Sequence, residues 1–387
     1  MSVIFRMRVK FNDLGKATGQ VRNQFLKEAS KLIGRGSFIL TPEVKDFEND
    51  WAKAVGAKYA VGVSSGTDAL YLAFAALGIG VGDEVITQGN AYNASVTAIL
   101  RAGAIPRFAD INPETLALDA NKIEPLINKK TKAILPVHLY GQACDMETVS
   151  KIAKKHKLKI VEDCAQAHLA SFKGKQAGVW GDIGAFSFYP TKNLGAFGDA
   201  GAVTTNDKKI YEKILALRDL GQVAKNDHGY LGFNMRLDPI QAILLKLKLP
   251  YLKANTKERQ ETALYYGKLF SEAGIPVVPV SKNQYAGHVY HLYVVRALKH
   301  KRDWLRGELK KLGVETAVHY PLPVYNQPFF SAGGLAASAF GGKKFRNSDK
   351  CPITDLASKQ IFSLPFFLGI TKPQQKYVVE SLKKVLS

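Results

Sequence analysis

A single lysine, Lys192, lies between two apolar runs in the stretch FSFYPTKNLGAFGDAGAV, residues 186–203. Each run is typical of a buried strand. A lysine at the end of a core strand loses hydration, which lowers the pKa of its amine and makes it a competent nucleophile toward a carbonyl group. The alternative is a lysine whose amine reaches solvent along an apolar surface, which is the commoner arrangement for a lone lysine.

Two carboxylates end another strand-like run, KIVEDCAQAH, at residues 159–168. Glu162 and Asp163 close the apolar part, and Gln166 and His168 follow directly. A carboxylate at the end of a core strand is costly unless a cation or hydrogen-bond donors meet it. We interpret Asp163 as a group that holds a cationic ring nitrogen, the alternative being a helix N-cap.

Small residues join a strand to a helix in AVGVSSGTDAL, residues 60–70. Around Gly66 and Thr67, backbone N–H groups at the start of the helix can approach a ligand closely, and the helix dipole favours an anion there. The pattern indicates a phosphate-binding turn, or else an ordinary N-cap formed by Ser65 or Thr67. It is not a Walker A loop, because GxxxxGK[ST] is absent.

The three features follow successive strands of one predicted sheet. In open α/β sheets, ligands collect at the carboxyl ends of the strands. A phosphate-binding turn, a carboxylate for a ring nitrogen and an amine nucleophile are the groups that a pyridoxal 5′-phosphate (PLP) site needs. The sequence therefore predicts such a site, although each feature taken alone has an ordinary structural explanation.

The elements that would position these groups alternate along the chain. From residue 58 to about residue 207, seven strand-like runs alternate with helical segments, which indicates an α/β fold with a mostly parallel, seven-stranded sheet covered on both faces. A long helical stretch follows Asp238, and we place a domain boundary inside it. We expect a large domain over residues 1–250 and a smaller α+β domain over residues 251–387, in which residues 331–344 are the most loop-like.

Composition supports a folded protein and limits its partners. The 387 residues are 46% hydrophobic, enough for a sizeable core, and 54 Lys plus Arg against 33 Asp plus Glu give a net charge of +21. The basic residues are spread over helix-like patterns, which is typical of solvated surfaces. Attraction for an acidic substrate is the next interpretation, and nucleic acid comes last because no basic motif with interleaved aromatic residues occurs.

The sequence shows no pattern typical of a targeting signal, a membrane span or a cysteine metal site. The first residues mix Arg and Lys into a short apolar stretch, unlike a signal peptide, and no run of about 18 apolar residues predicts a membrane span. We expect a cytoplasmic protein with no membrane partner. Cys144, Cys164 and Cys351 lack the spacing of a metal site, so we expect reduced thiols and no metal.

The ordered motifs resemble the DegT/DnrJ/EryC1/StrS family of sugar aminotransferases over nearly the whole chain. The similarity is carried by VSSGTDAL, GIGVGDEVIT, LPVHLYGQACDM, VEDCAQAH, GAFSFYPTKNLGAFGDAGAV, LGFNMRLDPIQA, HVYHLYVVR and AVHYPLPVYNQP. The resemblance implies the aspartate aminotransferase-like fold of type I PLP-dependent transferases. It also implies PLP, or its amino form PMP, as cofactor.

The resemblance also implies roles for individual residues. Lys192 would form the Schiff base with the cofactor, Asp163 would pair with its pyridinium nitrogen, and Gln166 would lie near its phenolic oxygen. The other cofactor contacts implied are the phosphate ligands Gly66, Thr67 and Ser187, an aromatic ring from Tyr92 stacked on the cofactor, and Asn234, which would reach the phosphate in the neighbouring subunit.

Further implications concern the assembly and the substrate. Asn234 implies a homodimer with shared active sites, and His319 and Tyr320 are candidate substrate contacts. A core role is the alternative for Tyr92, and a structural role is the alternative for the last two residues.

The reaction implied is transfer of an amino group from an amino acid, which we expect to be glutamate, to a nucleotide-diphosphate-linked keto sugar. Asp199 and Ala200 stand where members that act at C4 tend to carry a different, glycine-rich sequence, which favours C3 of a 3-keto-6-deoxyhexose. The alternatives are C4 of a 4-keto sugar, a keto-inositol or a non-nucleotide keto sugar. A more distant alternative is a non-catalytic, basic nucleic-acid-binding or regulatory protein.

Overall fold

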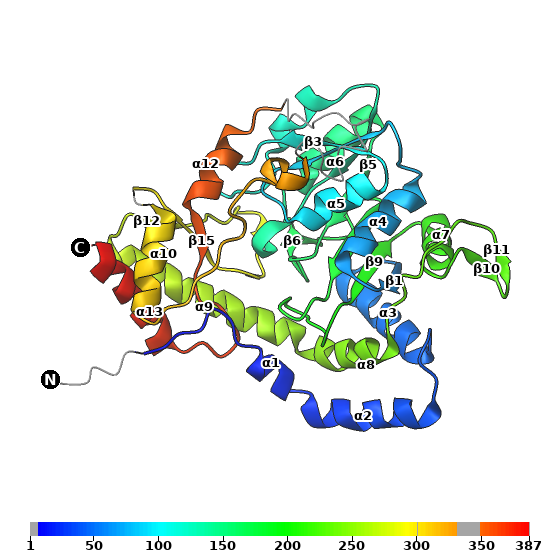
Figure 1. Cartoon of the computed structure of the whole chain (residues 1–387), viewed down its shortest axis with the longest axis horizontal. Coiled ribbons are helices and arrows are strands. Elements are labelled where there is room, and N and C mark those ends of the chain that lie inside the picture. Colours follow the sequence, from blue (N-terminus) through cyan, green and yellow to red (C-terminus); the bar gives the residue numbers. More distant parts are fainter. Residues whose placement is uncertain (1–6, 300, 331–348, 387) are drawn as a thin grey trace.

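A seven-stranded sheet forms the centre of the molecule in the computed structural model, which describes residues 7–299, 301–330 and 349–386 (Figure 1). The strand order is β1-β9-β8-β5-β4-β2-β3, and all strands are parallel except β9, which is antiparallel to both neighbours. The strands are β1 (Tyr59–Val63), β2 (Glu84–Gln88), β3 (Ile105–Ala109), β4 (Thr131–Leu135), β5 (Lys159–Asp163), β8 (Ile183–Ser187) and β9 (Gly201–Thr205). The α/β prediction with a mostly parallel, seven-stranded sheet is confirmed.

Helices cover both faces of this sheet, which is why β2 and β9 are buried at every position. One core forms between the sheet and the apolar sides of α4 and α7, and another lies under α3 and α8. The helices around the sheet are α3 (Pro42–Val55), α4 (Gly66–Leu77), α5 (Asn93–Arg101), α6 (Met146–His156), α7 (Lys208–Arg218) and α8 (Pro239–Lys248).

A second group of elements packs beside the sheet at the C-terminal end of the chain. It consists of α9 (Leu252–Ala273), β12 (Val277–Pro279), β14 (Val294–Ala297), α10 (Arg302–Lys311), α12 (Pro352–Gln360), β15 (Ile361–Ser363) and α13 (Lys372–Leu386). Strands β12, β14 and β15 form an antiparallel sheet, and the helices share a core with it. Figure 1 shows α9 as a long helix that runs from this group to the base of the large sheet.

The boundary expected at residue 250 falls in the single 3₁₀ turn Leu249–Tyr251, between α8 and α9. Val9 forms a parallel bridge with Val314 and packs in the C-terminal core. The first residues described therefore contact the C-terminal group. The division into residues 1–250 and 251–387 stays a prediction, and the predicted loop at residues 331–344 lies outside the described residues.

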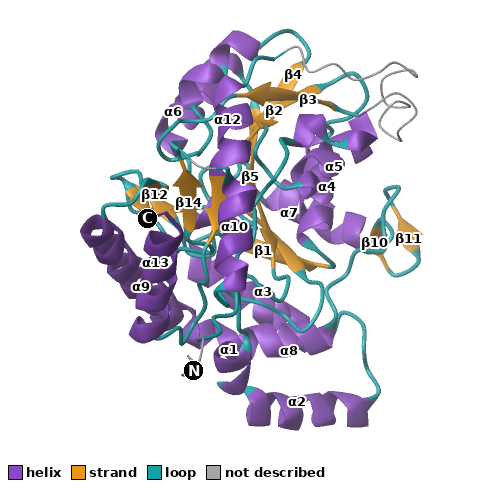
Figure 2. Ribbon diagram, turned by 60° about the vertical axis from the view of Figure 1, so that its left-hand side comes forward, coloured by secondary structure: helices purple, strands orange, loops and turns teal. Residues whose placement is uncertain are grey.

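Two segments extend from the body of the molecule. Helix α2 (Arg22–Arg35) packs on α8 along the base, and a hairpin of β10 (Gln222–Ala224) and β11 (Asp227–His228) projects from the side near α7 in both ribbon views (Figures 1 and 2). The remaining short elements are α1 (Gly15–Gly19), the small sheet of β13 (Ala286–Gly287), β6 (Ser171–Phe172) and β7 (Lys175–Gln176), and 3₁₀ turns at Ala120–Lys122, Glu124–Leu126, Leu139–Gly141, Val324–Asn326 and Pro328–Phe330.

Within the described ranges, no helix combines the length and the apolar character that crossing a membrane requires.

Helix α3 supports the strand that leads to Lys192. The helix begins with Pro42 as its first residue, and Gly56, whose φ of 76° is left-handed, caps its C-terminal end after Val55. On its inner side, Trp51 is fully buried and packs edge-on against Phe186 and Phe188 at ring-centroid distances of 5.1 Å each. The indole therefore fixes the inner surface of β8 just before the chain turns toward Lys192.

Replacing Trp51 by Ala tests this support. We expect Trp51→Ala to lower the free energy of unfolding by about 3–5 kcal/mol, because a large buried side chain leaves a cavity. The indole N–H is buried without a hydrogen-bond partner, so Trp51→Phe loses no hydrogen bond and should lower it by less than about 1.5 kcal/mol. The midpoint of thermal unfolding, followed by circular dichroism, measures both changes. Equal midpoints for the two variants would contradict this account.

Candidate active site

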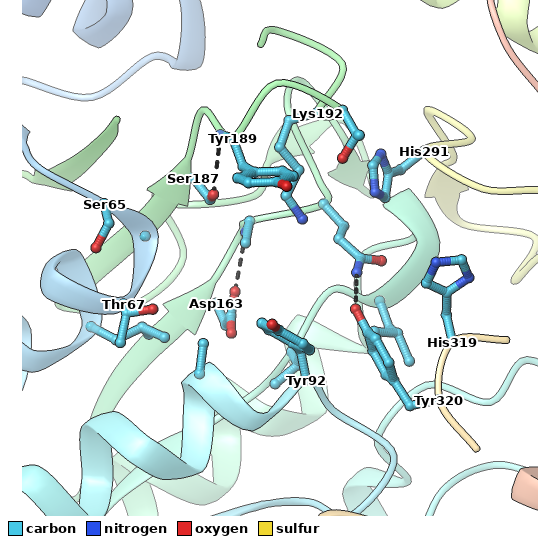
Figure 3. Close-up of a pocket in the computed structure, with 18 of the residues that line it drawn as sticks. Ser65, Thr67, Tyr92, Asp163, Ser187, Tyr189, Lys192, His291, His319 and Tyr320 are labelled. Carbon is cyan, nitrogen blue, oxygen red and sulfur yellow. Dashed lines mark hydrogen bonds between the residues drawn. The ribbon is translucent and has the colours of Figure 1, made fainter. Parts of the chain in front are cut away.

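A cavity of ≈ 400 Å³ opens where β1, β5 and β8 end at one edge of the sheet (Figure 3). Nine of the ten predicted site residues line it, so residues far apart in the sequence come together as the strand order requires. The lining consists of Ser65, Gly66, Thr67, Leu70, Tyr92, Ala94, Val137, Leu139, Asp163, Ala165, Gln166, Ser187, Tyr189, Thr191, Lys192, Asp199, His291, His319 and Tyr320.

Lys192 lies in a tight turn that follows β8 directly. Its backbone N–H donates to the carbonyl of Tyr189 at 2.8 Å, and Ala196 N–H donates to the carbonyl of Phe188 at 2.7 Å, which closes the turn. Only glycine fits at Gly195, since a Cβ there would lie 2.3 Å from the carbonyl oxygen of Pro190. Burial lowers the pKa of the Lys192 amine to about 8, and the nearby Asp163 carboxylate opposes that shift. Lys192 is therefore not a surface lysine.

Asp163 ends β5, the strand beside β8, and its carboxylate is buried. One oxygen, Oδ2, accepts the hydroxyl of Ser95 at 2.7 Å, and Oδ1 accepts the backbone N–H of Ala165 at 3.1 Å. These donors fix the orientation of the carboxylate, which lines the cavity below Lys192 in Figure 3. A carboxylate held in this way can bind a cationic nitrogen and keep it protonated.

The start of α4 and the end of β8 form the predicted anion site. Ser65 caps α4 by accepting the N–H of Asp68 at 3.1 Å. A Cβ on Gly66 would lie 2.5 Å from the Cβ of Ser187, so only glycine lets the helix start contact the strand end. Thr67 and Ser187 line the same wall of the cavity. The N–H groups of Gly66 and Thr67 at the start of the helix, together with the helix dipole, favour an anion here.

Two tyrosines and a glutamine form the opposite wall. Gln166 is oriented by its side-chain oxygen, which accepts the N–H of Tyr140 at 2.7 Å, and its amide donates to the hydroxyl of Tyr320 at 3.2 Å. Tyr92 precedes α5 and packs against Tyr320 with ring centroids 5.2 Å apart. Because Tyr92 is 57% exposed, the alternative of a core tyrosine is wrong.

Three histidines lie around Lys192. Burial, followed by the charge of Lys192, lowers the pKa of His168 to about 3 and that of His319 to about 4, and the same two causes hold the pKa of His291 well below its usual value. His319 hydrogen-bonds through Nδ1 to the hydroxyl of Ser363 at 2.8 Å, and His291 through Nδ1 to the side-chain oxygen of Asn193 at 3.3 Å. The histidines of the site are therefore neutral near pH 7.

Asn234 is the predicted site residue that does not line this cavity. It forms an isolated antiparallel bridge with Asp219 near the projecting hairpin, and its side chain is exposed. Its predicted role was a contact with the cofactor of a neighbouring subunit, so that role stays a prediction.

Sequence reasoning missed several residues of the site. Ser95 orients Asp163 although 68 residues separate them, and only the sheet order brings α5 to that carboxylate. Tyr189, Thr191 and Asp199 lie within the stretch that carries Lys192, so their position in the sequence was an available signal. His291 comes from the C-terminal part of the chain; it lies within the motif HVYHLYVVR, but no role at the site was predicted for it.

A second group of chemically active side chains lies behind β5, away from the cavity lining. His138, Glu162 and Cys164 are fully buried and close enough to share a metal ion. The carboxylate of Glu162 instead accepts N–H groups of Gly178 and Gly181 at 2.9 Å each and the ring N–H of His138 at 3.0 Å. This group therefore serves as a hydrogen-bonded support for the turn that enters β8.

The sheet order with one antiparallel strand, together with a buried lysine and carboxylate on adjacent strand ends, defines a type I PLP-dependent transferase fold. The chain belongs to the DegT/DnrJ/EryC1/StrS aminotransferase family, whose model matches residues 20–383. It is a PLP-dependent sugar aminotransferase, as predicted.

Individual relatives and a solved structure match this chain over nearly its whole length. A dTDP-3-amino-3,6-dideoxy-alpha-D-galactopyranose transaminase of Aneurinibacillus thermoaerophilus is 39% identical over 97% of this chain and 99% of its own. A "pleiotropic regulatory protein" of Geobacillus stearothermophilus is 40% identical over 97% of this chain and 98% of its own. The crystal structure of DesV from S. venezuelae in complex with a ketimine intermediate superimposes with a TM-score of 0.90 at 36% identity, covering 98% of this chain and 99% of DesV.

The residues of the cavity fit the cofactor of the family. The carboxylate of Asp163 suits a ring nitrogen, the start of α4 suits a phosphate, and the amine of Lys192 suits an aldehyde. When bound, PLP supplies an electron sink for the reaction.

The low pKa of Lys192 predicts how fast cofactor-free protein captures PLP at different pH values. With a pKa of about 8, the neutral amine makes up about a tenth of Lys192 at pH 7, and the capture rate should rise about tenfold per pH unit up to pH 7 and level off above pH 8. Absorbance at rapid mixing measures the rate. Nα-acetyl-lysine, measured in parallel, corrects for the pH dependence of PLP itself. Lys192→Arg should show no capture. A capture rate that still rises at pH 10 would refute the prediction.

Proposed function

We propose that this enzyme transfers the amino group of an amino acid, glutamate, to C3 of a nucleotide-diphosphate-linked 3-keto-6-deoxyhexose. The observation that carries the chemistry is the buried amine of Lys192 beside the carboxylate of Asp163. Asp199 and Ala200 favour C3, and the relative from Aneurinibacillus thermoaerophilus, named for a 3-amino-3,6-dideoxy sugar, supports the same carbon.

Each residue of the site has a specific role in this proposal. Lys192 would hold the aldehyde of the cofactor, and its amine, when free, would be the group that moves the proton of the transfer. Asp163, held by Ser95, keeps the ring nitrogen protonated. Gln166 contacts the phenolic oxygen, and Tyr92 stacks on the ring. The phosphate ligands are Gly66, Thr67 and Ser187.

His319 and Tyr320 are the proposed contacts of the sugar. His319 is neutral and fixed by Ser363, and Tyr320 is fixed by Gln166, so both present oriented polar groups to the cavity. Burial, together with the charges of Tyr92 and Asp163, raises the pKa of Tyr320, so its hydroxyl keeps its proton.

We also propose that the active unit is a homodimer in which Asn234 completes the site of the other subunit. Large apolar side chains are exposed on the two projecting segments, at Leu26 and Ile33 of α2 and at Leu231 beside the hairpin, where 91% of the residue is accessible. A second subunit that packs on both projecting segments would cover these apolar side chains.

A conservative change at Asp163 tests the proposed electronic role. Asp163→Asn keeps the volume but removes the charge that holds a proton on the ring nitrogen, so we expect kcat to fall by at least about a hundredfold while the cofactor still binds. Ser95→Ala, which removes only the orienting hydroxyl, should reduce kcat much less. Single-turnover kinetics with glutamate, followed by absorbance, measure both. A normal rate in Asp163→Asn would overturn the role.

A panel of acceptors tests the substrate. Holoenzyme is offered glutamate with dTDP- and UDP-linked 3-keto and 4-keto sugars, a keto-inositol and a non-nucleotide keto sugar, and amino products are identified by mass spectrometry. We expect turnover of a nucleotide-linked 3-keto-6-deoxyhexose and the highest kcat/KM there. Turnover of the keto-inositol alone would refute the nucleotide requirement, and preference for a 4-keto sugar would refute C3. Borohydride reduction should attach the cofactor to Lys192 and to no other residue.

A further inference from the structure

A second, smaller cavity lies on the other side of the turn that carries Lys192. Its volume is ≈ 70 Å³, more than twice the ~30 Å³ that a water molecule occupies in the liquid. It is bounded by the turn itself, by the end of α8, by α9 and by the segment that contains α1. The lining residues are Asn12, Asp13, Leu14, Ala17, Thr18, Pro190, Thr191, Lys192, Asn193, Ala196, Phe197, Lys248, Arg259 and Leu368.

Two cations of this cavity have no carboxylate partner among the described residues. Arg259 is only 8% exposed; one Nη donates to the carbonyl of Tyr290 at 3.2 Å, and its Nε is buried without any hydrogen-bond partner. Lys248 donates to the carbonyl of Gly195 at 2.6 Å. Burial alone lowers the pKa of Lys248 to about 8 and is the main reason that the pKa of Arg259 falls to about 10, yet both remain cationic near pH 7.

The acidic residues nearby are engaged elsewhere. The carboxylate of Asp13, which also lines the cavity, pairs with Lys10 at 3.3 Å and accepts the N–H of Gly15 at 2.8 Å. Glu258, the neighbour of Arg259 in α9, pairs with Lys16 at 2.7 Å and accepts the N–H of Gly369. Neither carboxylate forms an ion pair with Arg259 or Lys248.

A buried cation such as Arg259 is unfavourable without a carboxylate partner, because a backbone carbonyl is only a dipole and does not neutralise a charge. Arg259 and Lys248 line the same small cavity, and a guanidinium together with a lysine amine is a donor set that suits an oxyanion. We propose that this cavity binds one small oxyanion of the size of phosphate, held by Arg259 and Lys248 beneath the Lys192 turn. The inference does not depend on the identity of the sugar.

The location gives the anion a consequence for the active site. Lys192 lines both cavities, and Lys248 is bonded to Gly195 of the same turn. A bound anion would hold Lys248, and through it the turn, in one arrangement. Binding to the folded protein alone also stabilises it, so the unfolding midpoint should rise with anion concentration.

The test is equilibrium dialysis of labelled phosphate against holoenzyme, in which the cofactor already fills the anion site of α4. Ionic strength is held constant with a bulky sulfonate salt. We expect one phosphate per chain whose affinity falls about 30-fold or more in Arg259→Gln and in Lys248→Met. Lys253→Met, which removes an exposed positive charge from the same helix as Arg259, should bind phosphate as the unchanged enzyme does.

Two further measurements keep the test decisive. If Arg259→Gln does not fold, phosphate binding is compared between Lys248→Met and the unchanged enzyme. Lys248 is partly exposed, so we expect Lys248→Met to fold. Crystals of holoenzyme soaked in selenate should show an anomalous peak in the cavity between Lys248 and Arg259. Phosphate binding that is identical in all variants, with no peak in this cavity, would overturn the proposal and would leave the proposed aminotransferase function untouched.

Discussion

The burial of the Lys192 amine beside the Asp163 carboxylate is the constraint on which the rest of the structure depends. Two opposite charges removed from water are stable only when their geometry is fixed and their remaining hydrogen bonds are satisfied. Strands β5 and β8 are neighbours in the sheet, so their carboxyl ends carry the two groups to one edge. The closed turn at Gly195 and the hydroxyl of Ser95 then determine where each group points.

The end of β5 provides a carboxylate for the cavity and a second carboxylate that supports the neighbouring strand β8. This is possible because successive side chains of a strand point to opposite faces. Asp163 lines the cavity, whereas Glu162 points the other way and accepts the N–H groups of Gly178 and Gly181. That turn leads directly into β8, and a Cβ on Gly178 would lie 2.4 Å from the ring of Phe186. Adjacent residues of β5 therefore have different functions: Asp163 places its carboxylate in the cavity, and Glu162 supports strand β8, which leads to Lys192.

Local sequence predicted the elements well, because the strands are short apolar runs separated by helices with glycine at their ends. It also predicted the groups that end those strands, such as Asp163, Lys192 and Gly66, since their chemistry is unusual for a core. It could not predict Ser95 or His291, whose contribution depends on which strands are neighbours and on how the C-terminal elements fold back. Tyr92 shows the same limit, since only the fold reveals that its ring is exposed at the cavity.

The histidines around Lys192 are neutral, which suits the roles of anchor and proton carrier that we propose for this lysine. His168 accepts the N–H of Leu194 through Nδ1 and donates through Nε2 to the carbonyl of Ser187, so a second proton would break a hydrogen bond as well as place a charge beside Lys192. Burial and the same lysine charge remove His291 and His319 from titration near pH 7. Among the described residues that line the large cavity and have a shifted pKa, only Lys192 has a pKa that moves toward pH 7. Burial, with the charge of Lys192 as the second cause, thus keeps the surrounding histidines neutral, and the proposed proton transfer would use the one lining amine whose pKa is near neutral.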